Sequence, residues 1–163
     1  MNYEGQICRG PMERSSYMLP VAVGCSYNRC KFCTLFRHLK YRELPMEQIE
    51  AELERVRSLG GNPKHVFLGD GNAFGLATKR LLEITDLIHR YFPGCQAINM
   101  DGTITNIQAK SREELLALRK AGICHLYLGI ESGLDDVLRY MGKDHNLDQA
   151  YRQIDRIQRA GFI

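Results

Sequence analysis

The feature that most constrains the fold is a regular alternation of short apolar runs with longer amphipathic segments. Apolar runs of strand length begin near residues 17, 65, 95, 123 and 162, and a segment with helical periodicity lies in each interval. Short buried strands that are joined by crossover helices form a parallel sheet. The sequence therefore predicts an α/β fold, a partial parallel β/α barrel of about four units.

The expected elements follow from the apolar pattern and from its turn residues. The strands are expected at 17–23, 65–68, 95–100 and 123–130, and the helices at 45–58, 78–91, 112–120, 135–141 and 147–160. Ser111 and Glu114 form a capping-box pattern at the start of the third helix. Pro20 inside the first run indicates a strand start or an unpaired backbone position. Residues 1–16 read as an irregular lead-in to a single core at 17–163.

A metal site is predicted in the nine residues that follow the first strand. Four residues separate Cys25 from Cys30, and two separate Cys30 from Cys33. Such short gaps suit thiolates that bind one inorganic centre, and three neighbouring cysteines are unsuited to disulfides. An iron–sulfur cubane usually takes four thiolates, so three would leave one iron open. The alternative is a structural zinc site that is completed by Cys8 or His38.

Three isolated cysteines and one basic loop have plainer interpretations. Cys8, Cys95 and Cys124 are expected to be free buried thiols, although the lead-in that carries Cys8 could fold back over the cluster. The stretch 37–42 is basic and aromatic, which is compatible with RNA binding. A solvated loop that covers the metal site is favoured, because the net charge of the chain is low.

Polar and glycine residues follow each predicted strand. The second strand ends in Gly69, Asp70, Gly71 and Asn72, the third in 99–102, and the fourth in Glu131, Ser132 and Gly133. Ligands of parallel sheets bind at the carboxyl ends of the strands, so these residues and the cysteines are expected to share one edge. Asp70 could simply cap a helix, but two acids on the edge that carries the cysteines favour a binding role.

Composition excludes several classes of protein. The chain has 163 residues, 44% of them hydrophobic and 25% charged, and its formal net charge of +3 does not indicate a nucleic-acid partner. The N-terminus lacks the basic start and apolar run of a secretion signal, and no apolar stretch approaches the ~20 residues of a membrane span. A soluble protein of the reducing cytoplasm is the expected setting.

These residues resemble those of the radical S-adenosylmethionine (SAM) enzymes. The likeness rests on the three-cysteine loop after the first strand, with Phe32 just before its last cysteine, and covers essentially the whole chain. The opening Tyr3-Glu4-Gly5, the L-G-D-G-N run from Leu68 and the G-I-E-S-G run from Gly129 resemble one uncharacterised branch. That branch is related to oxygen-independent coproporphyrinogen oxidases and to Elongator-type and methylthiotransferase catalytic domains.

The resemblance implies a cofactor and a chemistry. Cys25, Cys30 and Cys33 would hold a [4Fe-4S] cluster whose fourth iron binds S-adenosylmethionine. Reductive cleavage would then yield a 5′-deoxyadenosyl radical that abstracts hydrogen from an unknown substrate. An electron donor of the flavodoxin or ferredoxin type is implied as a partner.

The same resemblance assigns the residues around S-adenosylmethionine. Phe32 would lie beside the adenine, and the segment from Gly69 through Asp70 and Gly71 to Asn72 would meet the methionine amine. Glu131 and Ser132 would contact the ribose or the carboxylate. Glycine allows close approach of backbone to a ligand, and an acid can pair with an ammonium group.

Three departures from the family pattern leave other outcomes open. The commonest loop has three residues between its first two cysteines, and Leu68-Gly69-Asp70 lacks the first glycine of the usual Gly-Gly-Glu. The family barrel has six strands, whereas this sequence stops where a fifth begins, at Phe162. We therefore expect a fragment, or a chain that needs a C-terminal half or an oligomeric partner, and poor solubility alone. A zinc-stabilised binding module and an inactive remnant are the alternative functions.

Overall fold

A five-stranded sheet runs through the middle of the molecule. The computed structural model describes residues 3–4 and 8–163, so Gly5 of the opening tripeptide lies outside the described residues. The strands are β1 (Tyr17–Gly24), β2 (Arg42–Glu43), β3 (His65–Gly71), β4 (Ala97–Gly102) and β5 (Ile123–Leu128), in the order β2-β1-β3-β4-β5. Neighbouring strands are parallel except for β2, which runs antiparallel to β1. The predicted parallel sheet is confirmed.

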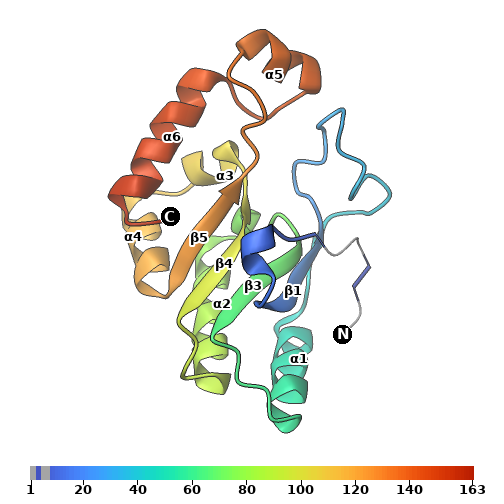
Figure 1. Cartoon of the computed structure of the whole chain (residues 1–163), viewed down its shortest axis with the longest axis vertical. Helices are drawn as coiled ribbons and strands as arrows, with labels where there is room; N and C mark the ends of the chain where they lie inside the picture. The colour runs from blue at the N-terminus through green and yellow to red at the C-terminus, as the bar shows by residue number, and fades with distance from the viewer. Residues whose placement is uncertain (1–2, 5–7) are drawn as a thin grey trace.

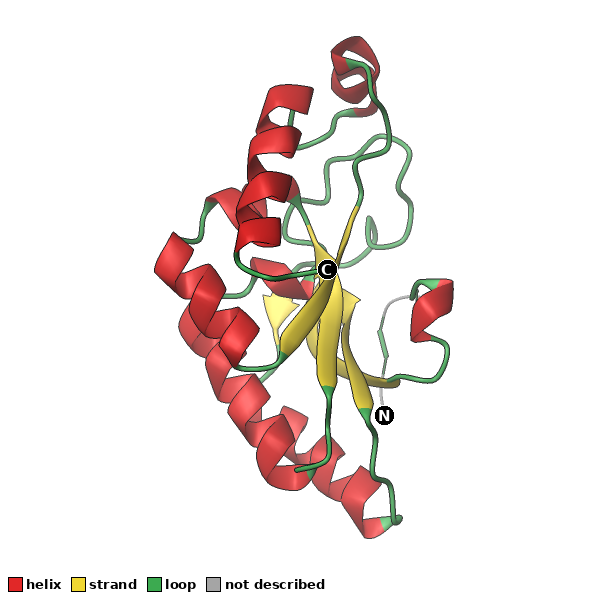
Figure 2. Ribbon diagram, turned by 60° about the vertical axis from the view of Figure 1, so that its left-hand side comes forward, coloured by secondary structure: helices red, strands yellow, loops and turns green. Residues whose placement is uncertain are grey.

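Helices lie along one face of the sheet, except for α5, which lies beyond its end, as Figures 1 and 2 show. They are α1 (Met46–Ser58), α2 (Thr78–Tyr91), α3 (Ile104–Gln108), α4 (Arg112–Lys120), α5 (Asp135–Met141) and α6 (Leu147–Arg159). Single 3-10 turns occupy Pro11–Glu13 and Ala73–Gly75. The predicted capping box is present, since Glu114 N donates to Ser111 Oγ and Ser111 N donates to Glu114 Oε2.

The apolar core fills the space between the sheet and these helices. Alternate residues of each strand point to it, and Val66, Leu68, Ile98 and Met100 are fully buried there. Burial of side chains of this size contributes about 1.5–3 kcal/mol each to folding. This layer holds the strands in place, and with them the loops at their carboxyl ends.

The 3-10 turn at Pro11–Glu13 lies beside the opposite face of the sheet (Figure 2). The carboxylate of Glu13, a residue only 2% exposed, accepts hydrogen bonds from Asn99 Nδ2 at 2.8 Å and from the Tyr127 hydroxyl at 2.6 Å. Ser16 Oγ is a third donor to the same carboxylate. A buried carboxylate needs such donors to offset its lost hydration. The expected irregular lead-in is therefore tied to β4 and β5.

Several boundaries differ from the expectation. β3 and β4 continue through Gly71 and Gly102, whereas β5 ends early, at Leu128. β2 and α3 were not predicted, since elements of two and five residues carry no readable periodicity. Pro20 lies within β1 opposite Gly69, and the register of β1 against β3 shifts after it.

The last residue pairs with β5. Ile163 N donates to Cys124 O, and Leu126 N donates to Ile163 O, both at 3.0 Å. One residue bonded to both neighbours of its partner is the pattern of a parallel pair. The expected start of a fifth strand is thus present as hydrogen bonds, although no strand is assigned there.

Burial of the isolated cysteines was predicted correctly for only one of them. Cys95 is buried, Cys124 is partly exposed and Cys8 is exposed. Cys124 lies on β5, and Cys8 precedes the 3-10 turn at Pro11–Glu13.

Candidate metal centre

The three clustered cysteines face one cleft at the carboxyl ends of the parallel strands. Cys25, Cys30 and Cys33 are free and partly buried, and all three line this cleft together with residues from the ends of β3, β4 and β5. The prediction that the cysteine loop and the polar strand ends share one edge of the sheet therefore agrees with the structure.

The cysteine loop is shaped by its own hydrogen bonds. Asn28 adopts a left-handed backbone with φ of 45°, and its amide Nδ2 donates to Phe36 O at 3.0 Å. The guanidinium of Arg37 donates to Cys33 O at 2.8 Å and to Cys30 O at 2.6 Å. These bonds fix the loop before any ligand is added, which reduces the entropy lost when the thiols bind a metal.

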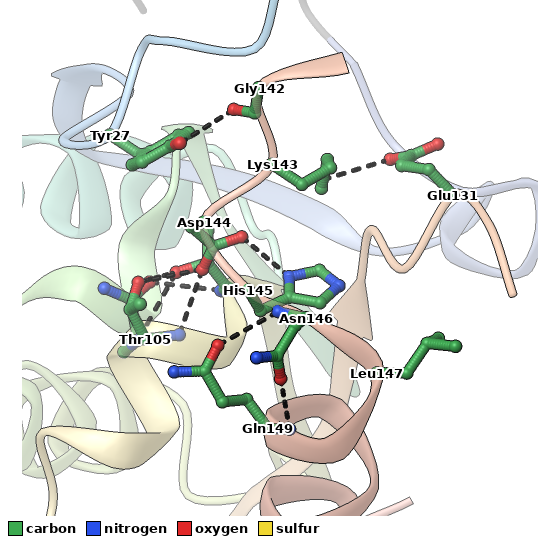
Figure 3. A network of polar contacts seen from close by, with 12 residues as sticks. Tyr27, Thr105, Glu131, Gly142, Lys143, Asp144, His145, Asn146, Leu147 and Gln149 are labelled. Carbon is green, nitrogen blue, oxygen red and sulfur yellow. Dashed lines mark hydrogen bonds and ion pairs between the residues drawn. The ribbon is translucent and has the colours of Figure 1, made fainter. Parts of the chain in front are cut away.

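The loop is also attached to the end of α5. The Tyr27 hydroxyl donates to Gly142 O at 2.7 Å, as Figure 3 shows, and Lys31 N donates to Met141 O at 2.8 Å. The ammonium of Lys31 lies 5.4 Å from the centre of the Tyr140 ring. Residues more than 100 positions apart in the sequence therefore set the position of the cysteines.

A pair of glycines brings the start of the loop against the end of β3. A Cβ at Gly71 would lie 2.0 Å from Gly24 O, and φ of Gly71 is +144°, so only glycine fits. The next residue, Asn72, is 6% exposed and lines the cleft, and its Nδ2 lies 3.5 Å from Ser26 Oγ. Its buried Oδ1 has no hydrogen-bond partner within the described residues, which leaves this atom able to accept a hydrogen bond.

The structure divides the predicted nucleoside-binding residues into two groups. Phe32, Gly71, Asn72 and Glu131 line the cleft, whereas Gly69, Asp70 and Ser132 are not among the described residues that line it.

The second group makes contacts elsewhere. Asp70 is buried, and its Oδ2 accepts a hydrogen bond from Glu4 N at 3.2 Å. Ser132 Oγ accepts a hydrogen bond from Leu134 N. Asp70 and Glu131 both have left-handed backbones, with φ of 64° and 70°. Such conformations cost non-glycine residues about 1–3 kcal/mol and concentrate at functional sites.

Lys143 is a cleft residue that the sequence did not indicate. Its ammonium lies 3.5 Å from Glu131 Oε1 and 5.8 Å from the centre of the Phe32 ring, and its side chain is 7% exposed. Burial raises the pKa of Cys30, and the positive charge of Lys143 opposes that rise. Lys143 follows a short helix with no recognisable pattern around it, so only the fold reveals its position.

A buried network holds Lys143 in place (Figure 3). Asp144 accepts hydrogen bonds from Thr105 N at 3.0 Å and Thr105 Oγ1 at 2.8 Å, and His145 Nδ1 lies 2.9 Å from its other oxygen. Burial acts to raise the pKa of Asp144, but the bonds from Thr105 and His145 outweigh it and leave that pKa below its usual value. The segment between α5 and α6 is thereby fixed to α3.

Two further cleft residues, Asp101 and Tyr127, lie on strands β4 and β5. Burial, with the nearby charge of Glu13, raises the pKa of Asp101 to about 6. Burial, with the hydrogen bond to Glu13, also raises the pKa of Tyr127 to about 12. The sequence placed Asp101 among the polar strand ends but gave no sign that the charge of Glu13 lies near it.

Comparison with known proteins decides the family. The family model described as the Radical SAM superfamily matches residues 19–163. The chain belongs to the radical SAM superfamily. Members of this superfamily are enzymes that use a [4Fe-4S] cluster and S-adenosylmethionine, so the family and cofactor predictions are confirmed at that level.

Individual relatives are distant and much longer. The chain is 25% identical to the heme chaperone HemW of Bacillus subtilis over 85% of its own length and 36% of that protein's. It is 26% identical to the threonylcarbamoyladenosine tRNA methylthiotransferase MtaB of Thermotoga maritima, covering 90% of this chain and 34% of MtaB. The chain thus spans about a third of the length of the curated relatives it matches.

The fold also matches solved radical SAM structures. The cobalamin-dependent enzyme OxsB, determined with aqua-cobalamin and S-adenosylmethionine bound, superposes with a TM-score of 0.73 at 19% identity, covering 90% of this chain and 22% of OxsB. This likeness supports the partial barrel. Within residues 3–4 and 8–163, no helix has both the length and the hydropathy of a membrane crossing.

Proposed function

We propose that this chain forms the cofactor-binding part of a radical SAM enzyme, in which Cys25, Cys30 and Cys33 hold a [4Fe-4S] cluster. The observation that carries the proposal is that these three free thiols line one cleft with polar groups from three other strand ends. When bound and reduced, the cluster supplies the electron that cleaves S-adenosylmethionine to methionine and a 5′-deoxyadenosyl radical.

The cleft offers a partner for each polar part of S-adenosylmethionine. The ammonium of Lys143 suits the carboxylate, and the unpartnered Oδ1 of Asn72 suits the methionine amine. Phe32 presents an aromatic face for the adenine, and Glu131 can accept from the ribose hydroxyls. Asp70 and Ser132 would then stabilise the strand ends through the hydrogen bonds that they accept, rather than bind the cofactor directly.

The spacing of the thiols along the loop favours a cluster over a single zinc ion. No group of three or more His, Cys, Asp or Glu side chains, in the part of the chain that the structure describes, is placed to hold one metal ion. The irons of a cubane occupy separate corners, so its thiolates need not converge on one point as the ligands of a zinc ion must.

Anaerobic reconstitution with iron and sulfide tests the proposal. We expect a brown protein with broad absorption near ~400 nm. Addition of a strong reductant and S-adenosylmethionine should release 5′-deoxyadenosine. A colourless protein that retains one tightly bound zinc would reject the cluster. A fully reconstituted cluster that yields no 5′-deoxyadenosine would identify an inactive remnant.

The proposal extends to the reaction on a substrate and to the protein partner. We propose that the radical abstracts hydrogen from an organic substrate and that a flavodoxin- or ferredoxin-like protein reduces the cluster. Free thiols and an oxygen-sensitive cluster suit a reducing cytoplasm. Most of the length of each relative lies outside the matched part, so substrate choice is not assigned to residues of this chain.

A further inference from the structure

One carboxylate that lines the cleft has no partner. Asp101 lies on β4, and no hydrogen bond or ion pair joins its side chain to another described residue. Burial and the negative charge of Glu13 both act against its charged form. Lys143, the one basic side chain among the described residues that line the cleft, lies beside Glu131 instead. A largely buried carboxylate without a donor is unfavourable, so Asp101 is an acceptor that lacks its donor.

The hydrogen-bond donors nearest to Asp101 are already used. Tyr127 is its register partner on β5, so the two side chains lie on the same face of the sheet. The Tyr127 hydroxyl donates its proton to Glu13 Oε1 at 2.6 Å. Asn99, two residues before Asp101, is buried and donates to the same oxygen from Nδ2 at 2.8 Å. Among these residues, the groups left for a ligand are acceptors, namely the Asp101 carboxylate and the Tyr127 hydroxyl oxygen.

We propose that Asp101 binds a protonated amine of the substrate, with the Tyr127 hydroxyl oxygen as a second acceptor. This inference rests on the proposed function and adds to it one substrate contact, which that function leaves unassigned. A primary ammonium group carries three N–H donors and a positive charge, which match a carboxylate and a neighbouring acceptor. The substrate class is therefore an organic amine.

Charge disfavours the other small ligands at this position. The carboxylates of Asp101 and Glu13 repel a phosphate or a carboxylate group. A divalent metal ion needs several oxygen ligands, and the Glu13 carboxylate already accepts from three donors. A neutral alcohol could donate one hydrogen bond but would leave the charge of Asp101 uncompensated. An amine satisfies both the charge and the acceptors.

The amine of S-adenosylmethionine is the competing occupant. The proposed cofactor binds the open iron, so its amine should lie beside the cysteine loop. Asn72 is placed there, because its side chain lies 3.5 Å from Ser26 of that loop and its Oδ1 has no partner within the described residues. Asp101 lies one strand further along the sheet, near the charge of Glu13. It is thus available to a second molecule in the same cleft.

The test uses the reconstituted chain with an oxidised cluster and excess S-adenosylmethionine, so that the cofactor binds but is not cleaved. The probes are butylamine and benzylamine, each paired with the alcohol of the same carbon skeleton. Saturation-transfer NMR titrations at pH 7.5 would give the dissociation constants, and Asp101 is ionised there because its pKa is about 6. Asp101→Asn removes the charge and keeps the shape. Asp86→Asn, on α2 with a side chain 73% exposed, is the matched control.

We expect each amine to bind the parent protein about 10-fold more tightly than its alcohol, and Asp101→Asn to abolish that preference. Asp86→Asn should keep the preference, and affinity for S-adenosylmethionine should stay within a factor of two in both variants. Equal binding of amine and alcohol by the parent protein would overturn the inference, and so would a preference that survives Asp101→Asn. Weaker binding of S-adenosylmethionine to Asp101→Asn would also overturn it, because the carboxylate would then serve the cofactor.

Failure of the proposed function would look different. A chain that forms no cluster, or whose reduced cluster releases no 5′-deoxyadenosine, contradicts the proposed function whatever its preference for amines. A chain that forms the cluster and releases 5′-deoxyadenosine, but binds amines and alcohols equally, contradicts only the role of Asp101. Urea denaturation of each variant would confirm that the protein compared is folded.

Discussion

The two faces of the central sheet are built from the same strands, but one face stabilises the fold and the other shapes the cleft. On the helix-covered face, Leu68 and Met100 are fully buried among apolar neighbours and need no specific partner. On the opposite face, Asn99 and Tyr127 are held by hydrogen bonds to the buried carboxylate of Glu13. Because side chains alternate along a strand, one residue step separates a stabilising position from a position that shapes the cleft.

The difference teaches where substitutions should be tolerated. Apolar packing on the helix face depends on volume, so its loss should lower stability without a specific effect on ligand binding. The polar cleft depends on particular partners, so its loss should alter the chemistry while the fold survives. Substitutions on the two sides can therefore be told apart by paired measurements of stability and activity.

The largest effect is expected at the cysteines. Cys30→Ala removes one thiolate from the proposed cluster, so release of 5′-deoxyadenosine should fall at least ~1000-fold. Cys95→Ala alters a buried thiol just before the start of β4 and should leave product within a few-fold of the parent. Product would be quantified after anaerobic reconstitution of each variant. Equal losses in the two variants would contradict the assignment of Cys30.

A substitution on the helix-covered face should lower the stability of the protein without a specific effect on ligand binding. Leu68→Ala creates a cavity at a fully buried position and should lower the free energy of unfolding by about 3 kcal/mol. Leu59→Ala is the matched control, since Leu59 is 76% exposed beyond the end of α1 and its loss should cost little. Urea denaturation would measure both. A Leu68→Ala variant as stable as the control would mean that this layer is not the main source of stability.

The helix face was also the part that the sequence could predict. Apolar periodicity located four parallel strands and the longer helices, and the cysteine spacing located the loop whose thiols line the cleft. Both signals are local, because they depend on residues within one turn or one strand of each other. The short elements β2 and α3 escaped prediction since they are held by neighbours rather than by a periodic pattern of their own.

The polar contacts around the cleft join residues that are far apart in the sequence, so no local pattern predicts them. Glu13 reaches Tyr127 across 114 positions, and Tyr27 reaches Gly142 across 115. Asp70 lies at the end of β3 and Asn72 directly follows that strand, yet of the two only Asn72 lines the cleft, where Gly71 closely approaches Gly24 between them. Such a choice follows from backbone geometry and could not be derived from residue type.

A substitution at Lys143 tests whether a cleft residue that the structure revealed, and the sequence did not, has a function. Lys143→Met keeps the apolar stem but removes the charge proposed to bind the carboxylate of S-adenosylmethionine. Loss of one charge-assisted hydrogen bond should weaken binding about 10- to 100-fold. Equilibrium dialysis with the reconstituted protein would measure affinity. Lys79→Met, on the exposed start of α2, is the control. Unchanged affinity in Lys143→Met would remove Lys143 from the binding site.

The smallest expected effect concerns Asp101, because burial of its charged carboxylate lowers the stability of the folded protein. The folded-state pKa of about 6 exceeds the ordinary value of 3.8, so the folded protein holds this proton more tightly than the unfolded chain does. Stability should therefore fall as pH rises from about 4 to 6, and the penalty should be fully present above that window. Burial is the main cause, and the charge of Glu13 adds to it.

Asp101→Asn removes the charge and should abolish this pH dependence. At pH 7.5 the variant should be more stable than the parent by about 1–2 kcal/mol, a value reduced from the full shift because Asp101 is partly open to the cleft. Near pH 4 the two should be equal. Asp86→Asn, at an exposed position of α2, should leave the pH profile unchanged. Urea denaturation across this range measures the difference, and a parental slope in Asp101→Asn would contradict the assignment of this pH dependence to Asp101. A stabilised variant would show that the cleft keeps a charged carboxylate at a cost in stability, as a site selected for binding does and a core selected for packing does not.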